Sequence, residues 1–282
     1  FVRSLSPDEK VCYHHIGFPE YNGVEVEVHF RPSFLFCFRH NRRLQGYYER
    51  VMDEQFAHRV KLGEQGEVAV PKAEFNLIFQ LTHIFTHLMN EGIGLRQLVD
   101  YFFVLKNTDF IGNTDGGAFF ANTDCTDNTD RIGGNADGDG FLLNTDCTDN
   151  TDKFSGNADG DGFLVNTDLT DRRLLQDELR RLGLWEFAGA VMYIMKEVFG
   201  LEDNRLIVPP DVKRGRLVLK EVLEAGNFGQ YDKRNWFGHS ALGHNLQRLY
   251  RDMRLVRFFP AEALSEPFFR IWHFFWRKRI VR

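Results

Sequence analysis

Four polar side chains alternate with apolar ones in a short run near the start of the chain. They are Glu25, Glu27, His29 and Arg31, and the residues between them are valines and a phenylalanine. Successive side chains of a β-strand point to opposite faces, so this period of two predicts a strand with the polar groups in one row. Carboxylates in such a row could bind a divalent metal ion, and the imidazole and guanidinium could bind phosphate. The pattern is also typical of the solvated face of an edge strand, and the residues alone leave both interpretations open.

A second pair of candidate metal ligands lies in a predicted helix. His83 and His87 are four residues apart and therefore share one helix face, a spacing that can hold zinc. We identify no third ligand in the neighbouring sequence, and histidines at this spacing also occur at packed helix edges. The pair therefore leaves both a metal site and a packing role open.

The elements that must position these residues are a hairpin and a set of helices. A strand around Val11 to Ile16 and a turn at Glu20 to Gly23 are expected to complete a hairpin with the alternating run. Apolar residues at spacings of three and four predict helices on both sides of residues 107–171, about two on each side. Three more helices are expected at Arg216 to Ala225, Ser240 to Val256 and Ala261 to Trp276.

The stretch of residues 107–171 is an acidic internal repeat. It contains 14 Asp and no Glu against Arg131 and Lys153, a net charge of −12, whereas the other 217 residues carry 33 basic and 26 acidic groups. Two 22-residue copies, 122–143 and 144–165, differ at four positions. Asn, Thr, Asp and Gly favour turns over helices and cores, so we interpret the stretch as a duplicated low-complexity insertion between helices.

Calcium binding is the functional alternative for this repeat. Each copy matches several positions of an EF-hand loop, in which oxygen ligands surround a glycine-turned backbone. Position 12 is Asp where Glu is usual, and the flanking sequence does not favour helices, so the match is weak. The candidate Ca²⁺ ligands are Asn135, Asp137, Asp139, Asp146, Asn157, Asp159, Asp161 and Asp168.

Composition excludes several classes of protein. Charged residues interrupt every apolar run before the roughly 18 residues that a membrane-spanning helix needs, so no membrane partner is expected. The 4 cysteines are widely spread and predict reduced thiols in a cytoplasmic protein. The segment Pro267 to Arg282 mixes aromatic and basic residues, but its helical spacing favours packing on the core over binding nucleic acid.

Several segments, taken in order, resemble a known family. They read VEVEVHFRPSFL, NRRLQGYYE, LTHIFTHLMNEGIGLRQLVDYFFVL, LRRLGLWEFAGAVMYIMKEVFG, AGNFGQYD and EPFFRIWHFFW. Together they are similar to the uncharacterised bacterial nucleotidyltransferases, in which a polymerase-beta-like domain precedes a helical region. The resemblance implies an α+β fold: residues 1–62 as the end of a nucleotidyltransferase domain, and residues 63–282 as a helical domain interrupted by 107–171.

The resemblance also implies a reaction and a site. The reaction is transfer of a nucleotidyl group from an NTP to an unknown acceptor, with Mg²⁺ held by carboxylates. Glu27 matches the family's third carboxylate and Glu25 is the fallback, while His29 and Arg31 are candidates for binding phosphate. His87 and Asp100 are expected to face the catalytic cleft and contact substrate.

One departure from the family pattern affects the expected activity. The family's Gly-Ser turn and Asp-x-Asp strand should precede the hairpin, and neither occurs ahead of the hairpin in this sequence. The sequence is therefore expected to be an N-terminally truncated fragment that is inactive alone. The alternative is a non-catalytic ligand-binding protein whose repeat binds calcium.

Overall fold

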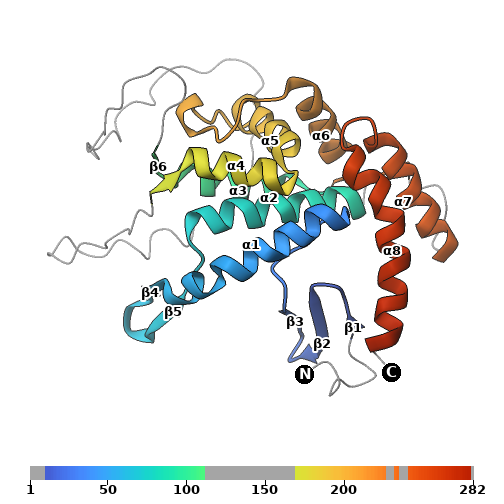
Figure 1. Cartoon of the computed structure of the whole chain (residues 1–282), viewed down its shortest axis with the longest axis horizontal. Helices are drawn as coiled ribbons and strands as arrows, with labels where there is room; N and C mark the ends of the chain where they lie inside the picture. Colours follow the sequence, from blue (N-terminus) through green and yellow to red (C-terminus); the bar gives the residue numbers. More distant parts are fainter. Residues whose placement is uncertain (1–9, 112–168, 227–231, 235–240, 281–282) are drawn as a thin grey trace, which may run out of the picture. The chain divides into compact units, whose positions relative to one another are not determined.

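The computed structural model describes residues 10–111, 169–226, 232–234 and 241–280. Small antiparallel strands come first in the chain, and helices form most of the rest of it, as Figure 1 shows. The predicted α+β class is thereby confirmed. None of the helices in the described residues is long and apolar enough to cross a membrane.

The predicted hairpin is present and carries a short third strand. β1 (Lys10–Val11), β2 (His15–Tyr21) and β3 (Val24–His29) form an antiparallel sheet in that order. Asn22 and Gly23 connect β2 to β3 with φ values of 51° and 80°, the left-handed conformation that tight hairpin turns require. The register shifts by one residue between Phe18 and Tyr21, which is a β-bulge in β2.

Two elements that the sequence patterns did not predict come after the hairpin. α1 (Phe38–Ala57) is a 20-residue helix, and β4 (Arg59–Lys61) pairs with β5 (Glu67–Ala69) around a short 3₁₀ turn at Gly63–Gln65. α1 is strongly polar and buries only one side, which explains why it lacks a clear apolar stripe in the sequence.

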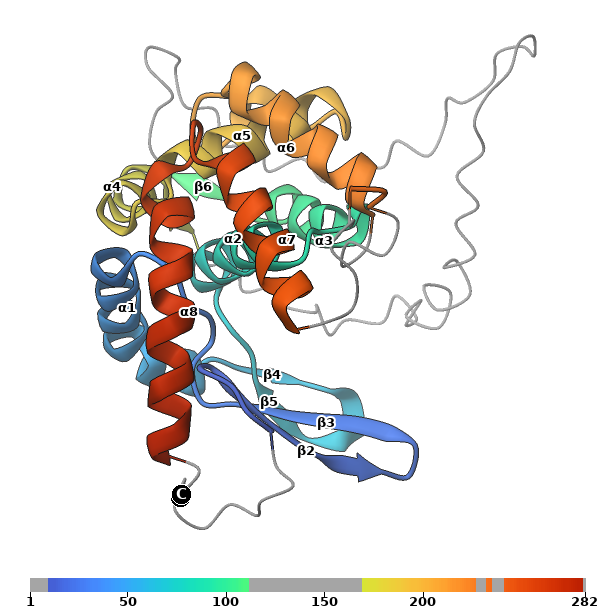
Figure 2. The ribbon, with the colours of Figure 1, turned by 90° about the vertical axis from the view of Figure 1, so that its right-hand side faces the viewer.

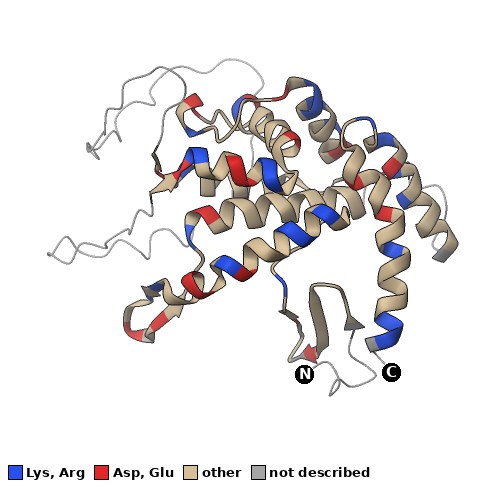
Figure 3. Ribbon diagram, viewed as in Figure 1, with Lys and Arg blue, Asp and Glu red and all other residues tan. Residues whose placement is uncertain are grey.

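The core is built around α2 (Ala73–Asn90). Its only Lys, Arg, Asp or Glu is Glu74, and Figure 3 shows the helix as almost entirely uncharged. Leu77, Ile78 and Leu81 are completely buried. α2 packs against α3 (Leu95–Lys106), and the ring of Phe85 stacks on that of Phe187 with 4.2 Å between centroids.

The two flanks of the acidic repeat meet in the fold. β6 (Phe110–Ile111) pairs in parallel with β7 (Thr170–Asp171), immediately before α4 (Arg172–Leu182). The side chain of Asp171 accepts hydrogen bonds from the backbone N–H groups of Arg173 and Leu174, which caps α4. Residues 112–168, which include every predicted calcium ligand, lie outside the described residues.

The remaining helices complete the domain. α5 (Trp185–Glu197) packs on α6 (Val212–Ala225), with a 3₁₀ turn at Asp203–Arg205 between them. α7 (Ala241–Leu255) and α8 (Pro260–Ile280) form a further antiparallel pair close to the predicted bounds. The lower part of α8 runs beside the hairpin, and Tyr13 contacts the rings of Phe269, Trp272 and Trp276 there. Phe269 is buried there, but Phe268, Ile271 and Phe275, which the helical spacing placed on the packed face, are exposed. The expected packing of α8 through these three residues is therefore wrong, and only part of its aromatic surface contacts the core.

Candidate functional site

A cavity of about 570 Å³ lies between the hairpin, α2, α7 and α8. Figure 2 shows the hairpin below α2, with α7 and α8 beside them. Six of the chain's 10 histidines line this cavity, although they come from four separate parts of the sequence. These residues are His14, His15, His29, His83, His87 and His273, and we call the cavity the histidine pocket.

Glu27 lies between two of these imidazoles. In the observed register His15 is directly opposite His29, and Glu27 is two residues before His29 on the same face of β3. The Oε1 atom of Glu27 is 3.6 Å from Nε2 of His15, and its Oε2 atom is 3.6 Å from Nε2 of His29. The Glu27 side chain is 52% exposed, so it remains accessible from the cavity.

The histidines that face one another here are poor cations. Burial lowers the pKa of His14 to about 3, and the neighbouring rings of His15, His29, His83 and His87 act on it in the same direction. Burial, followed by His87 and His29, lowers the pKa of His83 to about 4. Burial also lowers the pKa values of His15 and His87, with Glu27 acting in the opposite direction on both. His14, His15, His83 and His87 are therefore neutral imidazoles at neutral pH.

These shifts predict that lowering the pH from 7 to 5 destabilises the protein. His14 and His83 bind a proton more readily in the unfolded chain, so stability is fully present above their ordinary pKa near 6.5 and falls below it. The expected loss is about 1–2 kcal/mol per histidine across this range. Urea unfolding at both pH values, with a chelator present, should show a smaller loss for His14→Gln than for the unaltered chain. His244→Gln, at an exposed position on α7, is the control, and equal losses in both variants would contradict the pKa assignment.

The opposite wall of the pocket holds a buried ion-pair network. Glu266 of α8 is completely buried, with Oε1 3.3 Å from Nε of Arg248 and Oε2 3.1 Å from Nη2 of Arg270. Arg248 also donates to the side chain of Asn90 at the end of α2. The charges of these arginines are largely compensated inside the protein, so the wall offers little free positive charge to an anion.

The structure brings some of the predicted site residues together and separates others. Glu27, His29 and His87 line the histidine pocket, whereas Asp100 is exposed on α3 and does not. Arg31 lies beyond the end of β3: its Nη1 donates to the backbone carbonyl of Tyr13 at 2.8 Å, and its guanidinium covers the Tyr13 ring. Arg31 therefore holds the hairpin in place and is not among the residues that line the pocket. Glu25 is in β3, but its side chain lies outside the described part of the structure.

Sequence reasoning missed the histidines of the other hairpin strand. His15 begins β2 and His14 immediately precedes it, and their place in the pocket depends on the bulge that sets His15 opposite His29. The two adjacent histidines could be noticed in the sequence. Only the register of the hairpin shows that they lie beside His29.

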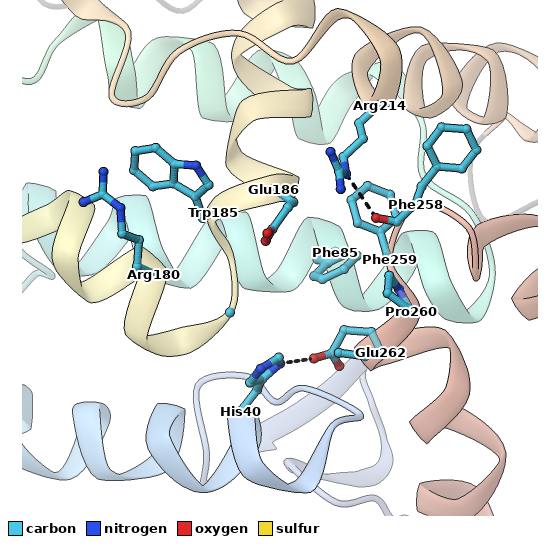
Figure 4. Close-up of a pocket in the computed structure, with 12 residues that line it drawn as sticks. His40, Phe85, Arg180, Trp185, Glu186, Arg214, Phe258, Phe259, Pro260 and Glu262 are labelled. Carbon is cyan, nitrogen blue, oxygen red and sulfur yellow. Dashed lines mark hydrogen bonds and ion pairs between the residues drawn. The ribbon is translucent and has the colours of Figure 1, made fainter.

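A second cavity, of about 400 Å³, is shown in Figure 4. On one side of it His40 of α1 meets Glu262 of α8, with 2.8 Å between Nδ1 and Oε1. The other oxygen of Glu262 accepts the backbone N–H groups of Phe36 and Cys37 at 2.7 and 2.9 Å. The ring of His40 also fills the space beside Gly183, which ends α4 with φ of 75°. These contacts join three helices, so we interpret this cavity as a structural junction.

Comparison with known proteins gives one match. The search of curated proteins and the search of solved structures find no similar chain. A family model described as uncharacterised nucleotidyltransferase matches residues 3–124. The matched segment contains the hairpin, α1, α2 and α3, and with them five of the six pocket histidines. This match confirms the resemblance seen in the sequence over residues 3–124, which are similar to the uncharacterised nucleotidyltransferase family.

Proposed function

We propose that the histidine pocket binds an NTP together with Mg²⁺, for transfer of the nucleotidyl group to an acceptor, and that Glu27 is one of the metal-binding carboxylates. The observation that carries this proposal is the accessible carboxylate of Glu27, which lines the histidine pocket together with five histidines of the family-matched segment. Carboxylate oxygens are the ligands that Mg²⁺ prefers.

The charges in the pocket make the metal ion essential to this proposal. Burial keeps His14 and His83 neutral, and Arg248 and Arg270 are both paired with Glu266. Glu27 would repel a bare triphosphate, because both carry negative charge. A divalent ion between Glu27 and the phosphates would reverse this repulsion and stabilise the charge that develops during transfer.

Turnover requires more carboxylates than Glu27 provides. Two-metal nucleotidyl transfer needs several acidic ligands around the reacting phosphate. Among the described residues, the other carboxylates lining the pocket are Glu91 and Glu266, and Glu266 is already paired with two arginines. We therefore propose that residues 1–282 alone bind Mg²⁺ and NTP but do not turn over. Catalysis would then depend on an Asp-x-Asp strand of the family type.

Glu27→Ala is expected to weaken Mg²⁺-dependent NTP binding at least about tenfold, which corresponds to ~1.4 kcal/mol. Binding is measured by calorimetry with an NTP, in Mg²⁺ and in EDTA. The difference in NTP affinity between Mg²⁺ and EDTA should be large for the unaltered chain and small for the Glu27 variant.

Glu67→Ala is the matched control, because Glu67 is an exposed carboxylate on β5 that does not line the pocket. It should leave Mg²⁺-dependent binding unchanged. Equal Mg²⁺-dependent affinities of the Glu27 and Glu67 variants for NTP would show that Glu27 does not bind the metal ion.

A further inference from the structure

We propose that His14, His15 and His29 form a binding site for a zinc-class divalent metal ion, in which imidazole nitrogens and not carboxylate oxygens are the ligands. One ring nitrogen from each of these residues lies within 4.8 Å of the other two. Nε2 of His14 and Nδ1 of His15 are 3.0 Å apart. Two ligands of a tetrahedral zinc ion are roughly 3.3 Å apart when each Zn–N bond is about 2.0–2.1 Å, so small side-chain rotations bring the three nitrogens to one ion.

The hairpin backbone holds these three rings together. His15 and His29 are directly opposite one another in the β2–β3 ladder, and their rings stack with 5.2 Å between centroids. The carbonyl oxygen of His14 accepts the backbone N–H groups of Phe30 and Arg31, which fixes His14 beside the end of β3. The ligands are therefore placed by backbone hydrogen bonds before any ion binds.

The donor set suits a transition metal ion. Imidazole binds metal through the lone pair of a ring nitrogen. Nδ1 of His14 is buried and has no hydrogen-bond partner among the described residues. Mg²⁺ prefers oxygen ligands, so three imidazoles select zinc or a similar transition metal.

Glu27 supplies the carboxylate that commonly accompanies a metal-binding histidine. It lies 3.6 Å from Nε2 of His15, the nitrogen on the side of the ring away from His14. A carboxylate there favours a proton on Nε2 and leaves Nδ1 free to bind metal. Three imidazoles also leave a fourth position for water or an oxygen ligand, as in catalytic zinc sites.

The other histidine and cysteine groupings of the described structure are less suitable. His83 and His87 are close, with ring centroids 4.4 Å apart, but they do not belong to a three-ligand group among the described residues. Cys37, His40 and Glu262 do form such a group. However, the carboxylate of Glu262 already accepts three hydrogen bonds that join α8 to the start of α1.

Metal titration of the whole chain tests the site without any nucleotide. Zn²⁺ is titrated against a chromophoric chelator in millimolar Mg²⁺, which occupies carboxylate-only sites. We expect one Zn²⁺ per chain with a Kd of about 1 µM or tighter. Co²⁺ at the same site should give the strong visible absorption of a four-coordinate complex. Absence of binding tighter than about 1 mM would overturn the proposal.

Single variants assign the ligands. His14→Gln, His15→Gln and His29→Gln should each weaken Zn²⁺ binding at least about 100-fold, and Glu27→Gln about 10-fold or more. Circular dichroism verifies that each variant is folded. His83→Gln, in the same pocket, and His244→Gln, on exposed α7, should bind as the unaltered chain does. An equal loss in either control, or no loss in the three ligand variants, would overturn the assignment. The result does not depend on whether the chain binds NTP.

Discussion

Replacing Glu262 by alanine is expected to destabilise the protein by about 3–5 kcal/mol, because three donors lose their acceptor in a buried place. The side chain is 3% exposed. Its two oxygens accept the N–H groups of Phe36 and Cys37 and the ring nitrogen of His40, although these residues lie more than 220 positions away in the sequence. The first turn of α8 is thereby joined to the segment that begins α1.

Urea unfolding measures this effect directly. Glu186→Ala is the matched control, since Glu186 is an exposed carboxylate that lines the same cavity from α5. This control substitution should change the free energy of unfolding by no more than about 0.5 kcal/mol. A similar unfolding midpoint for the Glu262 and Glu186 variants would show that the junction contributes nothing to stability.

Replacing Glu266 by alanine is expected to have the second largest effect, lowering the free energy of unfolding by about 2–4 kcal/mol. Arg248 and Arg270 lose the carboxylate that lies within 3.3 and 3.1 Å of them. The loss is smaller than at Glu262 because Asp252 is available as a replacement. Burial, followed by repulsion from Glu266, raises the pKa of Asp252 to about 8. Without Glu266, Asp252 should ionise and partly compensate the arginines.

A double-mutant cycle separates these contributions. Asp252→Asn alone should be stabilising at pH 7, because Asp252 is ionised in the unfolded chain and must bind a proton on folding, a cost that Asn avoids. The stabilisation of this variant relative to the unaltered chain should grow towards pH 8. The unaltered chain loses stability as the pH rises, because the pKa of Asp252 is raised in the folded state. In the Glu266→Ala background the same change should cost about 1–3 kcal/mol more than it does alone. Additive effects would refute the proposed exchange of partners.

Local periodicity predicted most of the fold but only part of the site. The apolar spacings of α2, α4 and α8 identified these helices because each buries one face. α1 was missed because polar residues outnumber its core residues Leu44, Tyr47 and Tyr48. It is also held by long-range contacts such as the one between His40 and Glu262. Such contacts join residues that are distant in sequence, and periodicity carries no information about them.

The hairpin illustrates why the site itself was only partly predictable. A regular two-residue turn at Asn22 and Gly23 would pair Tyr21 with Val24 and, by continuation, His15 with Phe30. The bulge in β2 shifts the register by one residue and places His15 opposite His29. A shift of one residue exchanges the faces of a strand, so the cluster of imidazoles depends on a feature that alternation cannot reveal.

The central claim is that the histidine pocket binds an NTP with Mg²⁺, and imidazole NMR tests it most directly. Uniformly ¹⁵N-labelled protein is titrated with a mixture of the four ribonucleoside triphosphates in Mg²⁺, and the ring signals of the histidines are followed. We expect the ring signals of His14, His29 and His83 to shift, because these residues line the pocket. The signals of His58 and His244, which do not line it, should not shift. Shifts confined to His58 or His244, or no shift at saturating nucleotide, would contradict the claim.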